Sequence, residues 1–165
     1  MFALQVPLTD EALLEIGRAN PGWRVERYGG SLLVSPPTGG RTGRRNARLA
    51  HDLEEFAEAH GYASFDSSTG FSLPNGDLLS PDASLVALEE WERLSADRQE
   101  GMIPLVPAVV VELRSKTDRR ASAIAKCETW FAEGVGYVVF VDPYDNDVRT
   151  WGDAPDGFPD LSTLG

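Results

Sequence analysis

Three adjacent valines at residues 109–111 constrain the fold of this chain more than any other feature. With Ala108 and Leu113 they form a short apolar run without alternation, which is typical of a strand buried on both faces of a sheet. Apolar residues then recur at helical spacing over residues 123–131, and residues 137–141 again suit a strand. Strand, helix and strand in this order predict a parallel pair joined by a right-handed crossover. The chain is therefore expected to be an α/β protein.

The segments around this unit predict the remaining elements. Thr9 caps a short N-terminal helix, and Gly29 with Gly30 separates two β-prone runs as in a hairpin. Thr117 or Asp118 is the expected cap of the crossover helix. The other predicted elements are a long helix over 47–57, a brief helix over 88–94, and strands at 62–65, 83–86 and 147–151.

Residues 1–151 are expected to form a single domain, in which helices flank a central mixed β-sheet behind the N-terminal helix and hairpin. A chain of 165 residues is long enough for one substantial core, but not for two. Residues 152–165 contain prolines and glycines and few strong apolar anchors. This tail is therefore expected to be irregular or loosely docked.

The net charge of −11 weighs against a nucleic-acid partner, because phosphate backbones attract basic proteins. However, nine of the 15 basic residues lie in two short segments, which is compatible with a locally positive cleft. The first group lies at the start of the long helix and could contact phosphates, although a solvated helix face is the commoner explanation for each residue taken singly. The two groups are Arg41, Arg44, Arg45 and Arg48, and then Arg114, Lys116, Arg119, Arg120 and Lys126.

The composition favours a cytoplasmic protein without a membrane segment. No apolar run approaches the roughly 20 residues that a membrane-spanning helix needs, and the first residues lack the pattern of a signal peptide. The single cysteine, Cys127, cannot close an intramolecular disulfide, which agrees with a reducing compartment.

Two carboxylates at strand ends suggest a metal site. Asp82 opens one predicted strand, and Glu112 ends the valine-rich strand, so both can project into one crevice. Magnesium held by one or two carboxylates supplies the charge neutralisation and the hydroxide that phosphodiester hydrolysis requires. Arg114 lies two residues after Glu112 and is expected to share its strand face, so that a carboxylate and a cation would face the same ligand.

Several motifs in a fixed order resemble a known family. The segments SPDASL, VVVELRSKTD and KCETWFAEGVGYVVFVDP, together with VERYGGSLLVSPPTGGRTGRRN, are similar to the Uma-type restriction endonucleases of the PD-(D/E)xK nuclease superfamily. The resemblance runs from about Thr9 to Trp151. It implies a restriction-endonuclease-like fold, a mixed sheet flanked by helices, that binds a divalent metal.

The resemblance assigns roles residue by residue. It places Asp82 on the acid of the superfamily's PD motif and Glu112 on the second acid. Arg114 stands where the superfamily has lysine, and arginine is always charged and cannot act as a base. The lysine role then falls to Lys126 on the following helix. Glu26, on the first hairpin strand, matches a family glutamate that joins the metal site or orients a ligand.

Each residue also has a purely structural interpretation. Asp82 suits a turn cap, and Glu112 can pair with Arg114 or Lys126 instead of a metal. Lys126 lies at the edge of an apolar helical stripe, where a lysine often packs its stem and keeps its charge in water.

The resulting hypothesis is a Mg²⁺-dependent endonuclease that hydrolyses DNA, with Mn²⁺ as a substitute ion. Asp82 and Glu112 would hold the metal, Lys126 would complete the catalytic set, and Glu26 and Arg114 would be accessory. The alternative is a catalytically impaired nuclease-fold module that binds nucleic acid or protein, which the missing lysine at position 114 and the acidic charge both favour. A homodimer is expected, because two-fold symmetry suits cleavage of both strands of a duplex.

Overall fold

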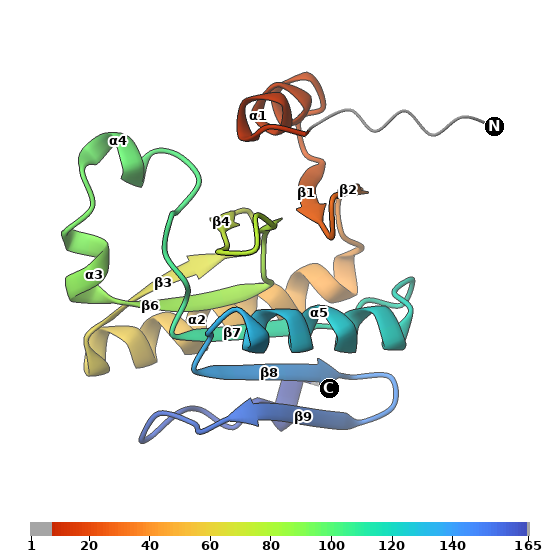
Figure 1. The fold of residues 1–165 in the computed structure, drawn as a ribbon. Helices are drawn as coiled ribbons and strands as arrows, with labels where there is room; N and C mark the ends of the chain where they lie inside the picture. Colours follow the sequence, from red (N-terminus) through yellow and green to blue (C-terminus); the bar gives the residue numbers. More distant parts are fainter. Residues whose placement is uncertain (1–7, 165) are drawn as a thin grey trace.

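The computed structural model describes residues 8–164, which form five α-helices, nine β-strands and one 3₁₀ helix (Figure 1). The elements are α1 (Asp10–Ala19), β1 (Arg24–Tyr28), β2 (Ser31–Ser35), α2 (Gly40–His60), β3 (Tyr62–Asp66), β4 (Phe71–Ser72), β5 (Leu78–Leu79), β6 (Ala83–Ala87), α3 (Leu88–Glu92), α4 (Ala96–Gln99), β7 (Val109–Leu113), α5 (Arg120–Ala132), β8 (Tyr137–Asp142), β9 (Asp147–Gly152) and η1 (Leu161–Leu164). Within this range, no helix is long and apolar enough to cross a membrane.

The main sheet has five strands in the order β3-β6-β7-β8-β9. Its central strand, β7, is buried at all five residues and runs parallel to β8, with Val109 opposite Tyr137. The other neighbouring pairs are antiparallel. The valine-rich strand, the crossover helix α5 and β8 thus form the predicted parallel unit, and the predicted mixed α/β sheet is confirmed.

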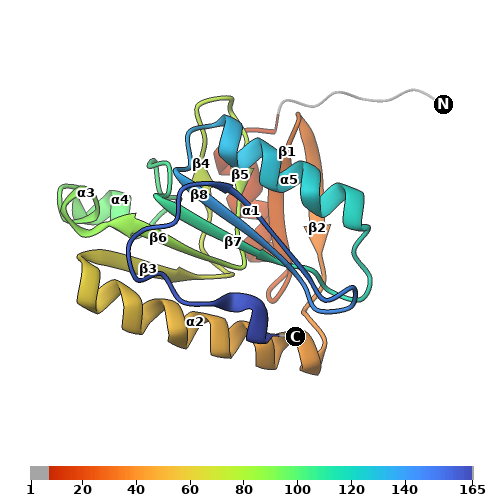
Figure 2. The same ribbon diagram turned by 90° about the horizontal axis from the view of Figure 1, so that it is seen from below.

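Helices cover both faces of this sheet (Figure 2). One face packs on α2 and η1, and the other packs on α5 and on β4 with its neighbouring loops. Alternate residues of β7 point to opposite faces. Val109 and Val111 belong to the α2 core and Val110 to the α5 core, so Glu112 lies on the α5 face.

The predicted hairpin belongs to a second, smaller sheet of order β2-β1-β5-β4. The sequence did not predict this sheet, because β4 and β5 have only two residues each, too few for a periodic signal. Glu26, in the middle of β1, is buried, and its Oε1 accepts the backbone N–H of Ser80 at 2.9 Å. Ser80 lies between β5 and β6, so this contact ties the hairpin to the edge of the main sheet.

The local signals for helix ends are partly confirmed. Thr9 caps α1 by accepting the N–H of Ala12, and Gly61 ends α2 in the left-handed conformation at φ 74°. The predicted cap of α5 was wrong, because Arg119 is the N-cap residue and makes no side-chain cap. Asp118 instead accepts the N–H of Ser115 at 2.8 Å and closes the preceding loop.

The tail after β9 is irregular up to η1, as one of the predicted alternatives has it, but it is not loosely docked. Leu161 and Leu164 of η1 are buried in the core beneath α2. Arg45 also donates to the Leu164 carbonyl at 3.0 Å, and Arg48 donates to Thr163. Two spaced leucines in a short 3₁₀ helix were enough to anchor the tail, although they gave no helical or strand pattern in the sequence.

We expect Leu161→Ala to lower the free energy of unfolding by about 3 kcal/mol, because it removes a buried leucine and leaves a cavity under α2. Urea denaturation at neutral pH measures the change. The exposed neighbour Ser162 supplies the control, Ser162→Ala, for which we expect a change within about 0.5 kcal/mol. Equal stabilities of the Leu161→Ala variant and the unmutated protein would contradict the docked tail.

Candidate functional site

One cleft of the structure has a volume of about 1090 Å³. It lies between the hairpin with α1 on one side and the ends of β6, β7 and α5 on the other. Its lining includes every residue that the sequence analysis assigned to catalysis or metal binding: Glu26, Asp82, Glu112, Arg114 and Lys126.

Asp82 and Glu112 face each other across two neighbouring strands. Ala83 pairs with Val111 in the antiparallel register of β6 and β7, so Asp82, one residue before β6, lies opposite Glu112. The Asp82 N–H donates to the Val111 carbonyl at 3.1 Å, and Asp82 Oδ2 accepts the Leu113 N–H at 2.7 Å. Directly opposed side chains have Cβ atoms about 4.5–5.5 Å apart. The two predicted acids are therefore brought together on rigid strand ends.

Lys126 reaches this pair from α5. Its Nζ lies 3.0 Å from Glu112 Oε1 and 2.9 Å from Glu26 Oε1, and it donates to the Ser80 carbonyl at 2.9 Å. An ammonium group has three protons to donate. All three therefore have acceptors, and Lys126 bridges carboxylates of the two sheets.

Arg24 and Trp130 complete the polar network, and sequence reasoning missed both. Arg24 Nε lies 3.5 Å from Glu26 Oε2, and its Nη1 lies 3.4 Å from Asp82 Oδ1. Trp130 Nε1 donates to Glu112 Oε1 at 2.8 Å. The available signal was periodicity, since Arg24 is two residues from Glu26 on one strand and Trp130 is four from Lys126 on one helix.

Burial and mutual repulsion shift the ionisation of the acids. Burial, aided by the charge of Asp82 and opposed by Lys126, raises the pKa of Glu112 to about 7. Burial likewise raises the pKa of Asp82, against the opposing effect of Arg24. Glu26 is buried too, but Lys126 and Arg24 outweigh burial and lower its pKa.

Lys126 stays a cation in this environment. Burial alone would lower its pKa, but the charges of Glu112 and Glu26 outweigh burial and raise it. A lysine with a raised pKa does not serve as a general base at neutral pH. Its contribution to chemistry is a fixed positive charge.

The structure gives Arg114 partners other than Glu112. Arg114 directly follows β7, and its N–H still donates to the Val141 carbonyl of β8 at 2.9 Å. Its Nη1 donates to Asp142 at 2.8 Å and to Asp145 at 3.2 Å. Asp142 is fully buried and also accepts Arg120, so Arg114 belongs to a network that joins the β7–α5 loop to the β8–β9 turn.

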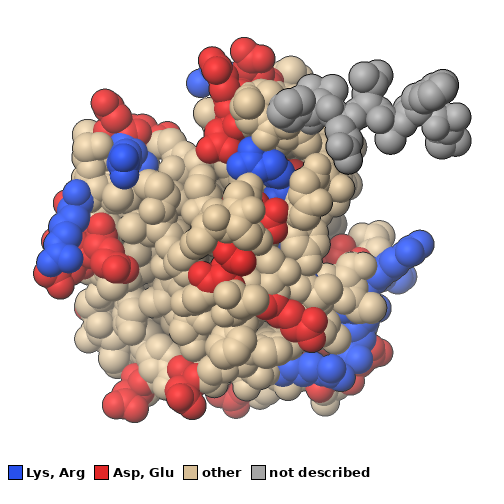
Figure 3. Space-filling view, in the orientation of Figure 1, with Lys and Arg blue, Asp and Glu red and all other residues tan. Residues whose placement is uncertain are grey.

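The four arginines of α2 divide into two pairs. Arg45 and Arg48 bind the C-terminal segment, as described above, whereas Arg41 and Arg44 are exposed. On the face shown in Figure 3, basic side chains form separate groups among acidic ones instead of one continuous positive surface. On this face, a phosphate chain would therefore meet only local positive groups.

The chain is similar to a known protein family and to a solved structure. The family model described as "Uma2: Putative restriction endonuclease" matches residues 10–160. The chain belongs to the Uma2 family. A solved structure of similar fold, a "putative nuclease belonging to DUF820" from Anabaena variabilis, has 12% sequence identity and a TM-score of 0.63, with 84% of this chain and 83% of that chain covered. No curated protein matches the chain.

These findings confirm the family resemblance and the restriction-endonuclease-like fold. At 12% identity, the Anabaena structure supports the fold alone. The roles of individual residues in this Uma2 chain therefore depend on its own geometry.

The carboxylates of the Uma2 site suit magnesium, although their present arrangement does not form a ready-made cage. Among residues 8–164, no three His, Cys, Asp or Glu side chains are placed to hold a metal ion together. Magnesium needs only one or two carboxylates, with water and phosphate oxygens as its other ligands. Asp82 and Glu112 meet that requirement, because they are hard oxygen ligands on opposed strand ends beside an open cleft. The donor set therefore fits the ion that the family implies.

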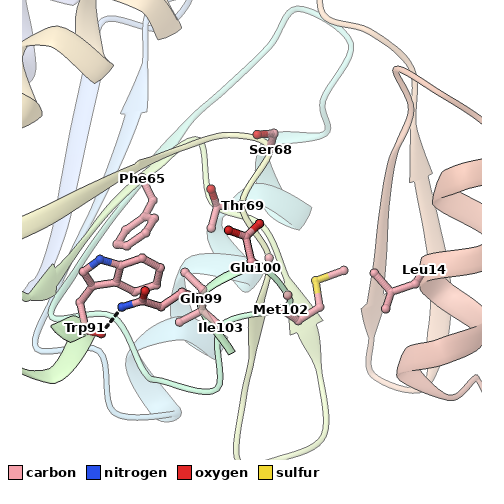
Figure 4. A pocket seen from close by; sticks show the side chains of 11 residues that line it. Leu14, Phe65, Ser68, Thr69, Trp91, Gln99, Glu100, Met102 and Ile103 are labelled. Carbon is pink, nitrogen blue, oxygen red and sulfur yellow. Dashed lines mark hydrogen bonds between the residues drawn. The ribbon is translucent and has the colours of Figure 1, made fainter. Parts of the chain in front are cut away.

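A second pocket of about 340 Å³ adjoins the cleft and shares Leu14, Ser68, Gly70 and Met102 with it. Figure 4 shows Leu14 facing this pocket from α1, opposite the packed rings of Phe65 and Trp91. Glu100 is the single ionisable residue of its lining. This pocket lacks opposed acids, so the larger cleft is the candidate active site of this Uma2 protein.

Proposed function

We propose that this Uma2 protein is a metal-dependent endonuclease that hydrolyses phosphodiester bonds of DNA at the cleft between the two sheets. The observation that carries the proposal is the convergence of Asp82, Glu112 and Lys126 from three elements at one end of the cleft. Such buried and mutually perturbed acids are typical of active sites.

The proposed roles follow from the contacts of each residue. Asp82 and Glu112 would hold Mg²⁺, or Mn²⁺ in its place, and the bound ion would supply charge neutralisation and an activated water. Glu26 holds Lys126 at 2.9 Å and so fixes the ammonium beside Glu112. Lys126 then provides a fixed positive charge for the phosphate that accumulates negative charge during hydrolysis.

The acidic charge of the molecule limits how DNA can approach. Exposed basic residues at the cleft, Arg18 on α1 and Arg119 before α5, would contact the phosphates on either side of the cleaved bond. Such binding would be strongly weakened by salt, because each phosphate contact releases a counterion. We therefore expect activity to require low ionic strength.

A plasmid-nicking assay tests the proposal. Purified protein with supercoiled plasmid and Mg²⁺ or Mn²⁺ should yield nicked and linear products, and EDTA should abolish them. The isosteric variant Glu112→Gln, prepared in the same way, controls for contaminating nucleases and should be inactive. The absence of cleavage of plasmid, linear duplex and single-stranded DNA with either metal would refute the proposal.

One observation favours the alternative of a binding module without catalysis. All three protons of Lys126 already have acceptors within the protein, and the superfamily's usual lysine position holds Arg114, which binds Asp142. A binding module would retard DNA in a gel-shift assay with Ca²⁺ but would not cleave it with Mg²⁺. An endonuclease would do both.

As the pH is raised from 5.5, we expect the affinity for Mn²⁺ to increase about tenfold per pH unit up to pH 7 and then to level off. The pKa of Glu112 is raised to about 7, so at lower pH a proton competes with the metal for this carboxylate. Calorimetry from pH 5.5 to 8.5, in buffers of different ionisation enthalpy, measures both the affinity and the released proton. A flat affinity over this range would contradict competition between a proton and the metal for Glu112 near pH 7.

We also propose a homodimer formed through β2. This edge strand exposes Leu32, Leu33 and Val34, which are 38%, 38% and 45% exposed. An apolar edge strand is a ready template for pairing with another strand, here the β2 of a second copy. Light scattering should give twice the monomer mass at micromolar concentration, and Val34→Lys should give a monomer. A monomer at high micromolar concentration would rule out the dimer.

A further inference from the structure

The five charged side chains at the end of the cleft alternate in sign. Asp82 contacts Arg24, Arg24 contacts Glu26, Glu26 contacts Lys126, and Lys126 contacts Glu112. With all five ionised the group carries one net negative charge. Each carboxylate therefore already has a cation beside it before any metal binds.

The two cations differ in how firmly they are held. Lys126 makes three contacts of 2.9–3.0 Å, and its side chain is 13% exposed. Arg24 makes its two contacts at 3.4 and 3.5 Å, and its side chain is 30% exposed. Charge-assisted hydrogen bonds at full strength are about 2.7–2.9 Å long. Arg24 is thus the loosely held cation, and it borders open space in the cleft.

Arg24 would compete with a divalent ion for Asp82. Its guanidinium lies against Asp82 Oδ1, and Asp82 Oδ2 is committed to the Leu113 N–H at 2.7 Å. Oδ1 is therefore the less strongly hydrogen-bonded oxygen, where a divalent metal would meet the guanidinium. Two positive groups beside one carboxylate repel each other in a partly buried site. Arg24, with its two long contacts, is the protein cation that is more easily displaced.

We propose that Arg24 is an exchangeable counter-ion: a divalent metal displaces its guanidinium from Asp82, and the released guanidinium binds a phosphate of the substrate in the cleft. The inference rests on the proposed metal-dependent nuclease activity and adds a residue to it. Before the metal binds, Arg24 neutralises Asp82 and Glu26. After release it offers a planar pair of N–H donors, which match two phosphate oxygens. Arg24 would thus couple metal loading to substrate binding.

Metal affinity tests the exchange directly. Arg24→Gln removes the competing charge, so we expect its affinity for Mn²⁺, measured by calorimetry, to be about 10- to 100-fold higher than that of the unmutated protein. Arg24→Lys keeps a cation, so we expect its affinity to stay within about threefold. Arg119→Gln is the matched control, because Arg119 lines the same cleft and makes no ion pair with any residue from 8 to 164.

Thermal unfolding provides a second reading if a variant is less stable. In EDTA, Arg24→Gln should melt at a lower temperature, because Asp82 and Glu26 lose a counter-ion. Saturating Mn²⁺ should raise its melting temperature more than it raises that of the unmutated protein or of Arg119→Gln. The exchange would be overturned if Mn²⁺ raised the melting temperature of Arg24→Gln by no more than that of the unmutated protein, and if the variant also bound Mn²⁺ no more tightly.

Substrate binding tests the second half of the inference. With Ca²⁺ in a gel-shift assay, Arg24→Gln should bind duplex DNA about tenfold more weakly despite its higher metal affinity. Unchanged DNA binding would overturn the phosphate contact. The two proposals can also fail separately. If Arg24→Gln binds Mn²⁺ more tightly but the unmutated protein does not cleave plasmid, the result supports the exchange of Arg24 for the metal and counts against the nuclease activity. Failure of both proteins to bind Mn²⁺ up to millimolar concentration would overturn the exchange.

Discussion

Asp82→Asn is expected to reduce metal-dependent plasmid nicking by at least about 10³-fold while leaving the protein folded. Asparagine preserves the shape of the side chain and its acceptor for the Leu113 N–H, so the strand ends stay in place. It removes the negative charge, and a neutral amide is a much poorer magnesium ligand than a carboxylate. Loss of a metal that activates the nucleophile and neutralises the phosphate accounts for several kcal/mol of the barrier. Initial rates at saturating Mg²⁺ measure the effect.

A buried aspartate outside the cleft provides the control. Asp77 accepts the Gly29 N–H at 2.8 Å and is 6% exposed, but it is not part of the cleft lining. Asp77→Asn should lower stability modestly and leave the nicking rate per folded molecule within about twofold. If both variants lose nicking activity to a similar degree, Asp82 has a structural role and not a catalytic one. If Asp82→Asn nicks plasmid at the rate of the unmutated protein, Asp82 is not an active-site residue.

Lys126→Met should destabilise the metal-free protein by about 3–5 kcal/mol at pH 8. The substitution keeps the apolar stem but leaves Glu26 and Glu112 without the cation that they share. Removal of one partner from a buried ion pair strands the other charge in a medium that solvates it poorly. Both glutamates are less than 10% exposed, so screening by water is small. Urea denaturation in EDTA measures the loss.

The loss should depend on pH in a definite direction. In the variant, the stranded carboxylates can take up protons as the pH falls, so the destabilisation should be smaller at pH 5.5 than at pH 8. The double variant Lys126→Met with Glu112→Gln should recover part of the loss at pH 8. Lys116→Met, at an exposed lysine of the preceding loop, should change stability by less than about 0.5 kcal/mol. A similarly small effect of Lys126→Met would show that the triple contact does not stabilise the fold.

The core of the fold was predictable because its signals are local. The valine run, the helical spacing up to Trp130 and the strand that follows fixed the parallel unit, and the strand-end positions of Asp82 and Glu112 indicated one crevice. Family resemblance added Glu26 and Lys126, which no spacing rule connects. The structure brings Glu26 and Lys126, 100 residues apart in the sequence, into contact, and Lys126 also contacts Glu112.

The failed expectations concern contacts that depend on tertiary geometry. Arg114 was expected to face the same ligand as Glu112, but the buried Asp142 at the end of the neighbouring strand binds its guanidinium. Arg45 resembled a phosphate ligand at a helix start, yet it binds the carbonyl of Leu164 from the opposite end of the chain. An arginine has a long reach and many possible acceptors, so its partner is set by the folded environment and not by neighbouring residues.

Calorimetric titration of Mn²⁺ into the unmutated protein and into Glu112→Gln at pH 8 tests the central claim most directly. At this pH the Glu112 carboxylate, with its pKa of about 7, is mostly ionised and available to a metal. We predict one ion per chain for the unmutated protein and at least about a 100-fold weaker affinity for Glu112→Gln. Equal affinities in the two proteins, or no binding by the unmutated protein at millimolar Mn²⁺, would contradict a metal site built on Asp82 and Glu112.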